Sequence, residues 1–378
     1  MARSATKFSV HLDALRALAA ITVFVMHGKG LFIGPIVNKA GSYTTGSSGI
    51  ANMSEYTSPA HEAVIVFFVL SGFFVGGGVL RAWQSNKWSW KTYGIQRLTR
   101  LWIVLIPALL ITVALDKTGL HFFGLDSAYG RPHWESVISP AILNTLNFRT
   151  FFGCLFFLQR ILVEPLGSNG ALWTLAYEFW FYVAFPLGLS ALSPRLSWPA
   201  RLVNAVLFIG AGVFVGKTIS AYFLIWLMGA ALQLIPKRLP AIRVRVLAPI
   251  SLIVLLVVST ALWALKWDLF VSDVIEGLAC AWLCYVLLHE TDDAPRNAYM
   301  SVSRGLSDMS YTLYLTHLPI MTFLCSLLLW YGITRGHDLK HFGIFAGVCA
   351  ITFGLCYLVY LCFEQHSDKV RRKLMATF

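Results

Sequence analysis

Ten long apolar segments constrain the fold of this chain more than any other feature of its sequence. A helix needs about 17–25 mainly apolar residues to cross a hydrocarbon core of about 30 Å. Segments of this kind lie near residues 12–33, 62–80, 99–116, 170–192, 201–216, 219–235, 246–265, 270–288, 307–331 and 342–363. Lipid admits only helices and closed barrels. The sequence therefore predicts an all-α integral membrane protein, a bundle of about ten transmembrane helices forming a single domain over residues 1–378, with no appended soluble domain.

The composition excludes an ordinary soluble protein. Hydrophobic residues make up 57% of the chain and charged residues only 13%, whereas soluble domains are about 25% charged. The net charge of +12 would suit nucleic acid, but the basic residues cluster between apolar segments and do not alternate with aromatic residues on a soluble module. We expect membrane lipids, and no nucleic acid, as partners.

The basic residues also assign an orientation, because cytoplasmic loops carry an excess of Lys and Arg. The basic loops and the tail all fall on one side when both termini are cytoplasmic, and we expect this orientation. The expected location is the cytoplasmic (inner) membrane, with a bacterial source. Two stretches are less regular. The boundary between the fifth and sixth segments, at Lys217, is poorly marked. The stretch 141–163 carries Arg149 and Arg160 and favours an amphipathic or re-entrant piece over an eleventh span.

Three ionisable residues are predicted to lie at one depth in the bilayer. Arg16 and His27 are eleven residues apart, which puts them on one helix face about 16 Å apart. Counting about 1.5 Å per residue from the segment ends brings His27, Glu178 and His317 to roughly the same plane. Intramembrane ionisable residues are costly and mark functional sites by default. The structural alternative is that each histidine is a hydrogen-bonded packing residue and Glu178 the partner of an arginine.

A second group of candidates lies near the cytoplasmic ends of the segments. Arg97 and Arg100 open the third segment and Arg81 ends the second, and arginine forks suit phosphate groups. Anchoring by the positive-inside rule is the alternative. The block "LSGFFVGGG" places Gly72 and Gly76 at a spacing that usually means close helix contact, although it also lets a ligand approach the backbone.

Five motifs in order along the chain resemble those of acyltransferase family 3, whose members are membrane O-acyltransferases that modify sugars and other hydroxyl compounds. The motifs are "LDALRALAAITVFVMH", "FFVLSGFF", "RLTR", "LWTLAYEFWFY" and "SYTLYLTH". Thr174 stands where the family usually has serine, which keeps the hydroxyl. Some members carry an extra esterase domain after the membrane part, so for this chain we expect transfer to finish within the membrane domain or to pass to a partner.

The resemblance implies an acyl-CoA donor, most often acetyl-CoA, with no metal. It also implies that His27 is catalytic and that Arg16, Arg97 and Arg100 serve the donor, to which we add Arg81. From the depth argument we add Glu178 as the carboxylate that orients or charges His27. The remaining candidates would line the site, although aromatic residues at such positions more often belong to the core or the interface belt: Ser71, Trp173, Tyr177, Tyr314 and His317.

The sequence thus predicts an enzyme that moves an acyl group, by expectation acetyl, from cytoplasmic acyl-CoA to a hydroxyl of an envelope or exported glycan or related acceptor. A covalent acyl-histidine route and direct transfer both fit. The acceptor can be a glycan, a lipid-linked sugar, a lipid or a small metabolite, and the sequence sets neither the acyl length nor the oligomeric state. The alternative is a proton-coupled polytopic transporter, because buried His and Glu residues also form proton relays. Transporters often show internal repeats, and we find none.

Overall fold

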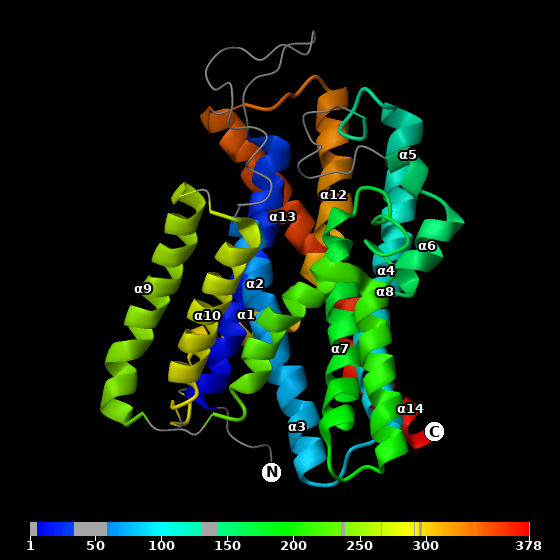
Figure 1. Cartoon of the computed structure of the whole chain (residues 1–378). Coiled ribbons are helices and arrows are strands. Elements are labelled where there is room, and N and C mark those ends of the chain that lie inside the picture. Colours follow the sequence, from blue (N-terminus) through cyan, green and yellow to red (C-terminus); the bar gives the residue numbers. More distant parts are fainter. Residues whose placement is uncertain are drawn as a thin grey trace. The chain divides into compact units, whose positions relative to one another are not determined.

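The protein is described by a computed structural model that covers residues 6–33, 59–130, 142–235, 239–265, 267–290, 292–294, 297–336 and 338–377. These residues form helices and only isolated β-bridges, with no β-strand among them (Figure 1). Within the described ranges, nine helical stretches are long and apolar enough to cross a membrane: Lys7–Phe32, Pro59–Gln84, Trp90–Phe123, Gly170–Leu192, Trp198–Ala231, Arg243–Leu262, Leu269–Leu287, Ser310–Trp330 and Leu339–Thr377. The predicted all-helical membrane class is confirmed, and the orientation of the termini stays a prediction.

The nine stretches and the ten predicted segments differ at one place. The helix α8 (Trp198–Ala231) covers both the fifth and the sixth predicted segments. Its 34 residues would extend about 51 Å, well beyond a hydrocarbon core of about 30 Å. Gly216 interrupts its helical backbone with φ 81° and ψ 176°, and the ribbon changes direction within α8 (Figure 1). The break lies next to Lys217, where the sequence placed the boundary, so the difference in number arises from counting a kinked helix once.

Residues 142–163, the described part of the stretch 141–163, contain no continuous spanning helix, as predicted. They form two short helices, α5 (Ile142–Thr145) and α6 (Phe148–Leu155). The side chain of Asn147 caps α6 by accepting a hydrogen bond from the backbone N–H of Thr150 at 2.9 Å. Phe148 and Phe152 are exposed while Cys154 is buried. The outward face of α6 thus carries large apolar side chains together with the exposed Arg149.

The chain divides into two compact units, and each is described by itself. The first unit comprises Met1–Ala19, Glu62–Tyr93 and Thr174–Ser307. The second unit comprises Ala20–His61, Gly94–Trp173 and Asp308–Phe378. The expectation of a single domain over the whole chain stays a prediction.

Close helix packing dominates the first unit. It contains most of α2 (Pro59–Ser71), the π-helix η1 (Gly72–Gly76), α3 (Gly77–Gln84), α7 (Trp173–Leu192), α8, α9 (Ala241–Leu265), α10 (Leu269–Leu287) and α11 (Ala298–Asp308). A Cβ atom built on Gly72 would lie 1.9 Å from the carbonyl oxygen of Trp226, and one built on Gly229 would lie 1.9 Å from that of Val69. Only glycine permits this approach of η1 to α8, which confirms the predicted close contact at Gly72.

The second unit is built around α12 (Ser310–Trp330), which is buried along most of its length and packs along α13 (Leu339–Cys362). Asp338 caps α13 by accepting from the backbone N–H of His341 at 2.9 Å. The unit also contains most of α4 (Trp90–Phe123), α5, α6, η3 (Gly170–Leu172), η4 (Glu364–His366), α14 (Ser367–Thr377) and the C-terminal half of α1 (Lys7–Phe32).

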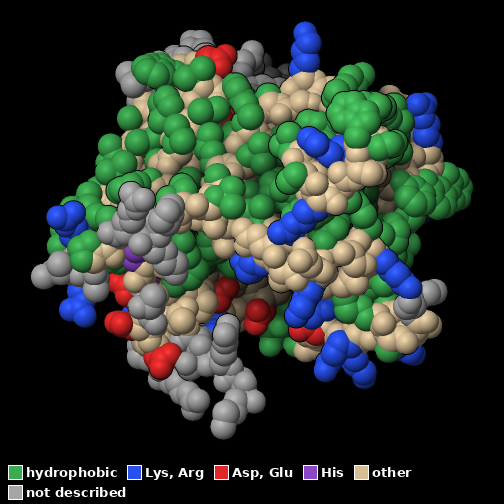
Figure 2. All heavy atoms as spheres, turned by 60° about the horizontal axis from the view of Figure 1, so that its bottom comes forward, with side chains coloured by type: hydrophobic (Ala, Val, Ile, Leu, Met, Phe, Trp, Pro, Cys, Tyr) green, Lys and Arg blue, Asp and Glu red, His purple; other side chains and the backbone are tan. Residues whose placement is uncertain are grey.

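Apolar side chains cover much of the protein surface in the view of Figure 2. Large hydrophobic residues are exposed along α8 and α9, including Ile209, Val213 and Leu256. In water such extensive apolar exposure would be unusual. In a bilayer it is the expected lipid-facing surface.

Several of these helices contain proline, which removes a backbone donor from the helical hydrogen-bond pattern. Pro186 in α7 leaves the carbonyl of Tyr182, four residues earlier, without its usual N–H partner. The hydroxyl of Tyr93 donates to that carbonyl oxygen at 3.0 Å. A side chain from another element thus replaces the missing backbone donor, as lipid-embedded helices require.

The packing at η1 predicts opposite outcomes for two neighbouring glycines. We expect Gly72→Ala to destabilise the protein by about 1–3 kcal/mol, because the new methyl group overlaps the Trp226 carbonyl. Gly78→Ala is the matched control, since no atom lies within 4 Å of its added Cβ. Thermal unfolding in detergent measures both variants, and equal unfolding temperatures for the two would contradict the packing argument.

Candidate active site

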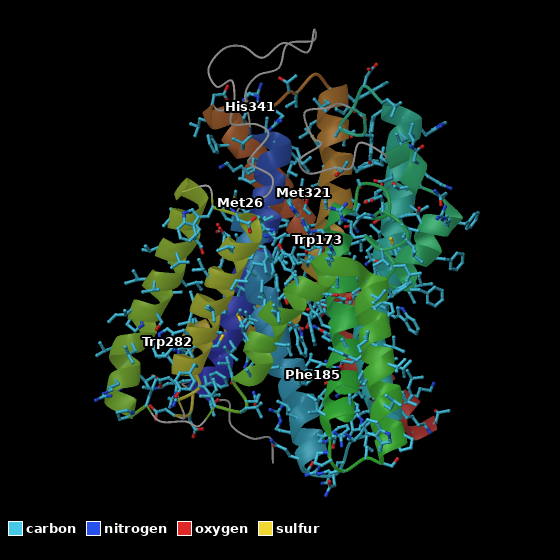
Figure 3. The ribbon with its side chains drawn as sticks, in the orientation of Figure 1. Met26, Trp173, Phe185, Trp282, Met321 and His341 are labelled. Carbon is cyan, nitrogen blue, oxygen red and sulfur yellow. The ribbon has the colours of Figure 1, made fainter. Side chains whose placement is uncertain are left out.

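Two of the predicted residues, His27 and His317, form a hydrogen-bonded pair within the second unit. Nδ1 of His27, on α1, lies 2.8 Å from Nε2 of His317, on α12. The two rings are nearly parallel, with an interplanar angle of 9° and centroids 5.1 Å apart. Figure 3 labels Met26, the residue before His27 on α1, and Met321, four residues after His317 on α12. The two helices are close here, because a Cβ built on Gly28 would lie 3.1 Å from Cε of Met321.

The hydrogen bonds of His317 assign the protons of the pair. Nδ1 of His317 lies 2.8 Å from the carbonyl oxygen of Leu313, and a carbonyl can only accept. Nδ1 of His317 therefore carries a proton, and in the neutral ring Nε2 is an acceptor. Nδ1 of His27 must then donate to it. A neutral His27 is left with its lone pair on Nε2, which is the atom that a general base needs.

Two aromatic side chains contact the His317 ring. Phe24 packs edge-on against the His317 ring at 6.0 Å, and Tyr314 lies 6.3 Å from it. His317 is fully buried, whereas His27 is partly exposed. Within the described part of the chain, no residue hydrogen-bonds Nε2 of His27. The pair thus has one fully buried ring, which is held by a backbone carbonyl, and one ring that is partly exposed.

Arg100 has a buried acidic partner that sequence reasoning did not identify. Its Nη1 lies 2.6 Å from Oε1 of Glu364, whose side chain is 1% exposed while that of Arg100 is 40% exposed. The other oxygen of Glu364 accepts from the backbone N–H and the hydroxyl of Thr312 at 2.9 and 2.5 Å. Arg100 also lies 5.3 Å above the ring of Tyr311. Arg100 therefore anchors the start of α12, and any role in donor binding would use its exposed part.

Two further predicted residues belong to the second unit. Arg97, one turn before Arg100 on α4, is half-buried. Trp173 stacks on His61 with centroids 6.5 Å apart and an interplanar angle of 11°. The proposed roles of Arg97 in donor binding and of Trp173 in lining the site stay predictions.

The other predicted basic residues lie in the first unit. Nη1 of Arg16, on α1, lies 3.4 Å from the hydroxyl of Ser307, and its guanidinium sits 4.7 Å above the ring of Phe74 in η1. Arg81, in the last turn of α3, donates to the side-chain oxygen of Gln233 at 3.0 Å. Both have protein partners, and their donor-binding roles stay predictions.

Ser71, Tyr177 and Glu178 also belong to the first unit. The hydroxyl of Ser71 accepts from the indole N–H of Trp226 at 3.1 Å, directly before the π-helix. Tyr177 is buried and stacks on Phe68, with centroids 5.9 Å apart, so it is part of an aromatic core. Glu178 lies on α7, and its expected action on His27 stays a prediction.

Buried acids that the sequence analysis passed over also occur inside the spanning helices. Asp273 and Glu276 are both buried on α10. Asp273 accepts a hydrogen bond from Tyr222, and Glu276 accepts one from Ser259 at 3.0 Å. Their position within an apolar segment was a usable signal, and the same rule that selected Glu178 would have found them. Within the described ranges, no three His, Cys, Asp or Glu side chains are arranged to hold a metal ion, and the expectation of a metal-free reaction stays a prediction.

These helices and the histidine pair define an integral membrane protein with ionisable residues inside its spanning segments. The profile of acyltransferase family 3, described as an acyltransferase domain, matches residues 10–361. The chain belongs to this family, as its motifs predicted. It is also similar to the peptidoglycan O-acetyltransferase OatA of Listeria monocytogenes serovar 1/2a, with 24% identity over 356 residues, which are 85% of this chain and 50% of the relative. The chain spans about half the length of this curated relative. No solved structure matches the chain.

The burial of Glu364 predicts that its ion pair with Arg100 contributes more to stability than the exposed ion pair of Arg160 with Glu164. We expect Glu364→Ala to cost about 1–3 kcal/mol, because it leaves buried donors of Thr312 unsatisfied. Glu164→Ala is the matched control, since its ion pair with Arg160 at 3.1 Å is exposed and such pairs contribute at most about 1 kcal/mol. The unfolding temperature in detergent is the measurement, and an equal loss in both variants would refute the anchoring role of Glu364.

Proposed function

We propose that this protein is a membrane O-acetyltransferase that transfers an acetyl group from cytoplasmic acetyl-CoA to a hydroxyl group of an envelope glycan. The observation that carries the proposal is the His27–His317 pair, which lies in a protein of an acyltransferase family and leaves a lone pair on Nε2 of the partly exposed His27 ring. The proposed location is the inner membrane of a bacterium, with both termini in the cytoplasm.

In the proposed reaction, Nε2 of His27 removes the proton of the acceptor hydroxyl as the oxygen attacks the thioester carbonyl. The C–O bond forms, the C–S bond breaks, and the thiolate of CoA takes the proton from His27. The products are the O-acetyl ester and CoA. His317 acts as a positioning residue, because it holds His27 in the tautomer that this step requires.

The donor would be bound through its phosphates by Arg97, with the exposed part of Arg100, both on α4. The donor-binding roles of Arg16 and Arg81 stay separate predictions. Arginine forks match phosphate geometry and keep their charge at every relevant pH. The acetyl group itself is proposed from the similarity to an O-acetyltransferase.

The acceptor class is proposed from the same relative, whose name states peptidoglycan. A glycan presents many hydroxyl groups of ordinary acidity, and such groups need a general base close to neutral pH. The transporter alternative is not favoured, because the family match covers nearly the whole chain.

The central experiment measures CoA release and labelled glycan from labelled acetyl-CoA by the purified protein in detergent or liposomes. Loss of a positioned general base typically costs about 10²–10⁴-fold, so His27→Ala should lower kcat by that factor. Its folding is checked by size-exclusion profile and unfolding temperature. Wild-type protein that releases no CoA above the background would refute the proposed reaction. Equal rates in wild type and a folded His27→Ala would refute the role of His27.

Donor binding is tested separately at Arg97. We expect Arg97→Ala to raise the KM for acetyl-CoA by about 10-fold or more, since a hydrogen bond to a charged group contributes about 1.5–3 kcal/mol. Lys87→Ala is the control, because Lys87 is an exposed residue outside the helices and its charge is explained by topology alone. An unchanged KM in Arg97→Ala would return this arginine to a structural role.

A further inference from the structure

The helix that carries His317 has a gap in its backbone hydrogen bonds. Residue 319 of α12 is proline and has no N–H, so the carbonyl of Leu315 loses the partner that an α-helix normally supplies four residues later. Leu315 is fully buried. A buried carbonyl without a donor is costly in a protein and more so in a membrane.

The side chain of Asn169 fills this gap. Its Nδ2 donates to the carbonyl oxygen of Leu315 at 2.8 Å and to the hydroxyl oxygen of Thr112 at 3.1 Å. Thr112 donates its own proton to the carbonyl of Ala108 at 2.8 Å, so both partners of Asn169 are acceptors here. Only the amide nitrogen can satisfy two acceptors, which assigns the orientation of this side chain.

The chain around Asn169 is itself held rigidly by α4. Asp116, one turn after Thr112, accepts from both the backbone N–H and the hydroxyl of Ser168 at 2.7 Å. Gly167 has φ 55°, and a Cβ there would lie 2.1 Å from the Asp116 carboxylate. Asn169 is fully buried. These contacts with α4 hold the segment that carries the Asn169 amide in position to hydrogen-bond to α12.

The freed carbonyl lies in the same turn of α12 that orients His317. The carbonyl of Leu313, two residues before Leu315, accepts the Nδ1 proton of His317. We infer that Asn169 is a positioning residue for the proposed acyl transfer: it replaces the donor that Pro319 removes and so holds the turn that sets His317 against His27. The effect of Asn169 on acyl transfer rests on the proposed function. The replacement of the missing Pro319 N–H by the Asn169 amide concerns folding alone.

The first unit shows the same arrangement at another proline, where the Tyr93 hydroxyl donates to the carbonyl that Pro186 frees. At both prolines, a side chain from another element thus donates to the carbonyl that has lost its backbone partner. Only the site at Pro319 lies in the turn that carries a residue of the histidine pair.

The experiment compares Asn169→Leu, Pro319→Ala and the double variant for acetyl transfer and for unfolding temperature. Asn169→Leu leaves the Leu315 carbonyl unsatisfied, which lowers the unfolding temperature. We also expect kcat to fall by about 10-fold with KM unchanged, because misplacing a reacting group by about 1 Å can cost up to about 10²-fold. Pro319→Ala restores a backbone N–H at the required position. It should therefore return most of the kcat and the unfolding temperature that Asn169→Leu loses.

Gln159→Leu is the matched control. Gln159 is also a fully buried amide, and its Nε2 donates to the carbonyl of Leu172 in η3 at 2.8 Å, whereas Asn169 donates to a carbonyl of α12 itself. We expect it to lower the unfolding temperature with kcat retained. The inference is overturned if Gln159→Leu slows transfer as much as Asn169→Leu, or if Pro319→Ala rescues neither quantity.

A second comparison separates positioning from general damage. In a His317→Ala background, Asn169→Leu should cause no further fall in kcat, because the residue through which it acts is gone. If the fall in kcat of the double variant equals the product of the two single falls, the inference is overturned. If wild-type protein proves inactive, the proposed function fails by itself, and rescue of the unfolding temperature by Pro319→Ala still decides whether Asn169 replaces the proline donor.

Discussion

A polar group buried in a lipid-embedded helix bundle has to find its partner inside the protein, because the surrounding lipid offers none. This constraint explains the main polar contacts of both units. Glu364 ties Arg100 to the first turn of α12, Asp116 fixes the segment before α7, and Tyr93 satisfies the carbonyl freed by Pro186. Each contact joins elements far apart in sequence, so the demand for hydrogen-bond partners also determines how the helices pack.

The histidine pair follows from the same constraint and gives it a chemical consequence. His317 is fully buried and donates to a backbone carbonyl, which leaves its second nitrogen as an acceptor. That acceptor dictates which nitrogen of His27 carries the proton. A backbone carbonyl thus sets the tautomer of a partly exposed imidazole through an intervening ring, in the way that a carboxylate does in many hydrolytic sites.

Much of this architecture was predictable, and two of the residues that were missed, Glu364 and Asn169, share a physical reason. Hydropathy and segment length located the spanning helices, and the depth argument selected His27 and His317 from opposite ends of the chain. It also selected Glu178, whose action on His27 stays a prediction. Glu364 and Asn169 were missed because they lie at or beyond the ends of apolar segments, where polar residues are ordinary. Their burial depends on which helix covers them, and no local pattern encodes that. Asp273 and Glu276 were missed although the pattern was present.

The amino-acid sequence by itself determined the class of the protein, the positions of its helices, the break near Lys217 and the acyltransferase family, because each of these depends on local composition or on short motifs. Only the tertiary structure decided that His27 hydrogen-bonds to His317 and that Arg100 pairs with a buried carboxylate. It also decided that Asn169 donates to the Leu315 carbonyl, which Pro319 deprives of its backbone donor. Asn169 and Leu315 are 146 positions apart in the sequence, and His27 and His317 are 290 positions apart. The geometry of these contacts arises from the packing of whole helices, which a reading of local sequence does not contain.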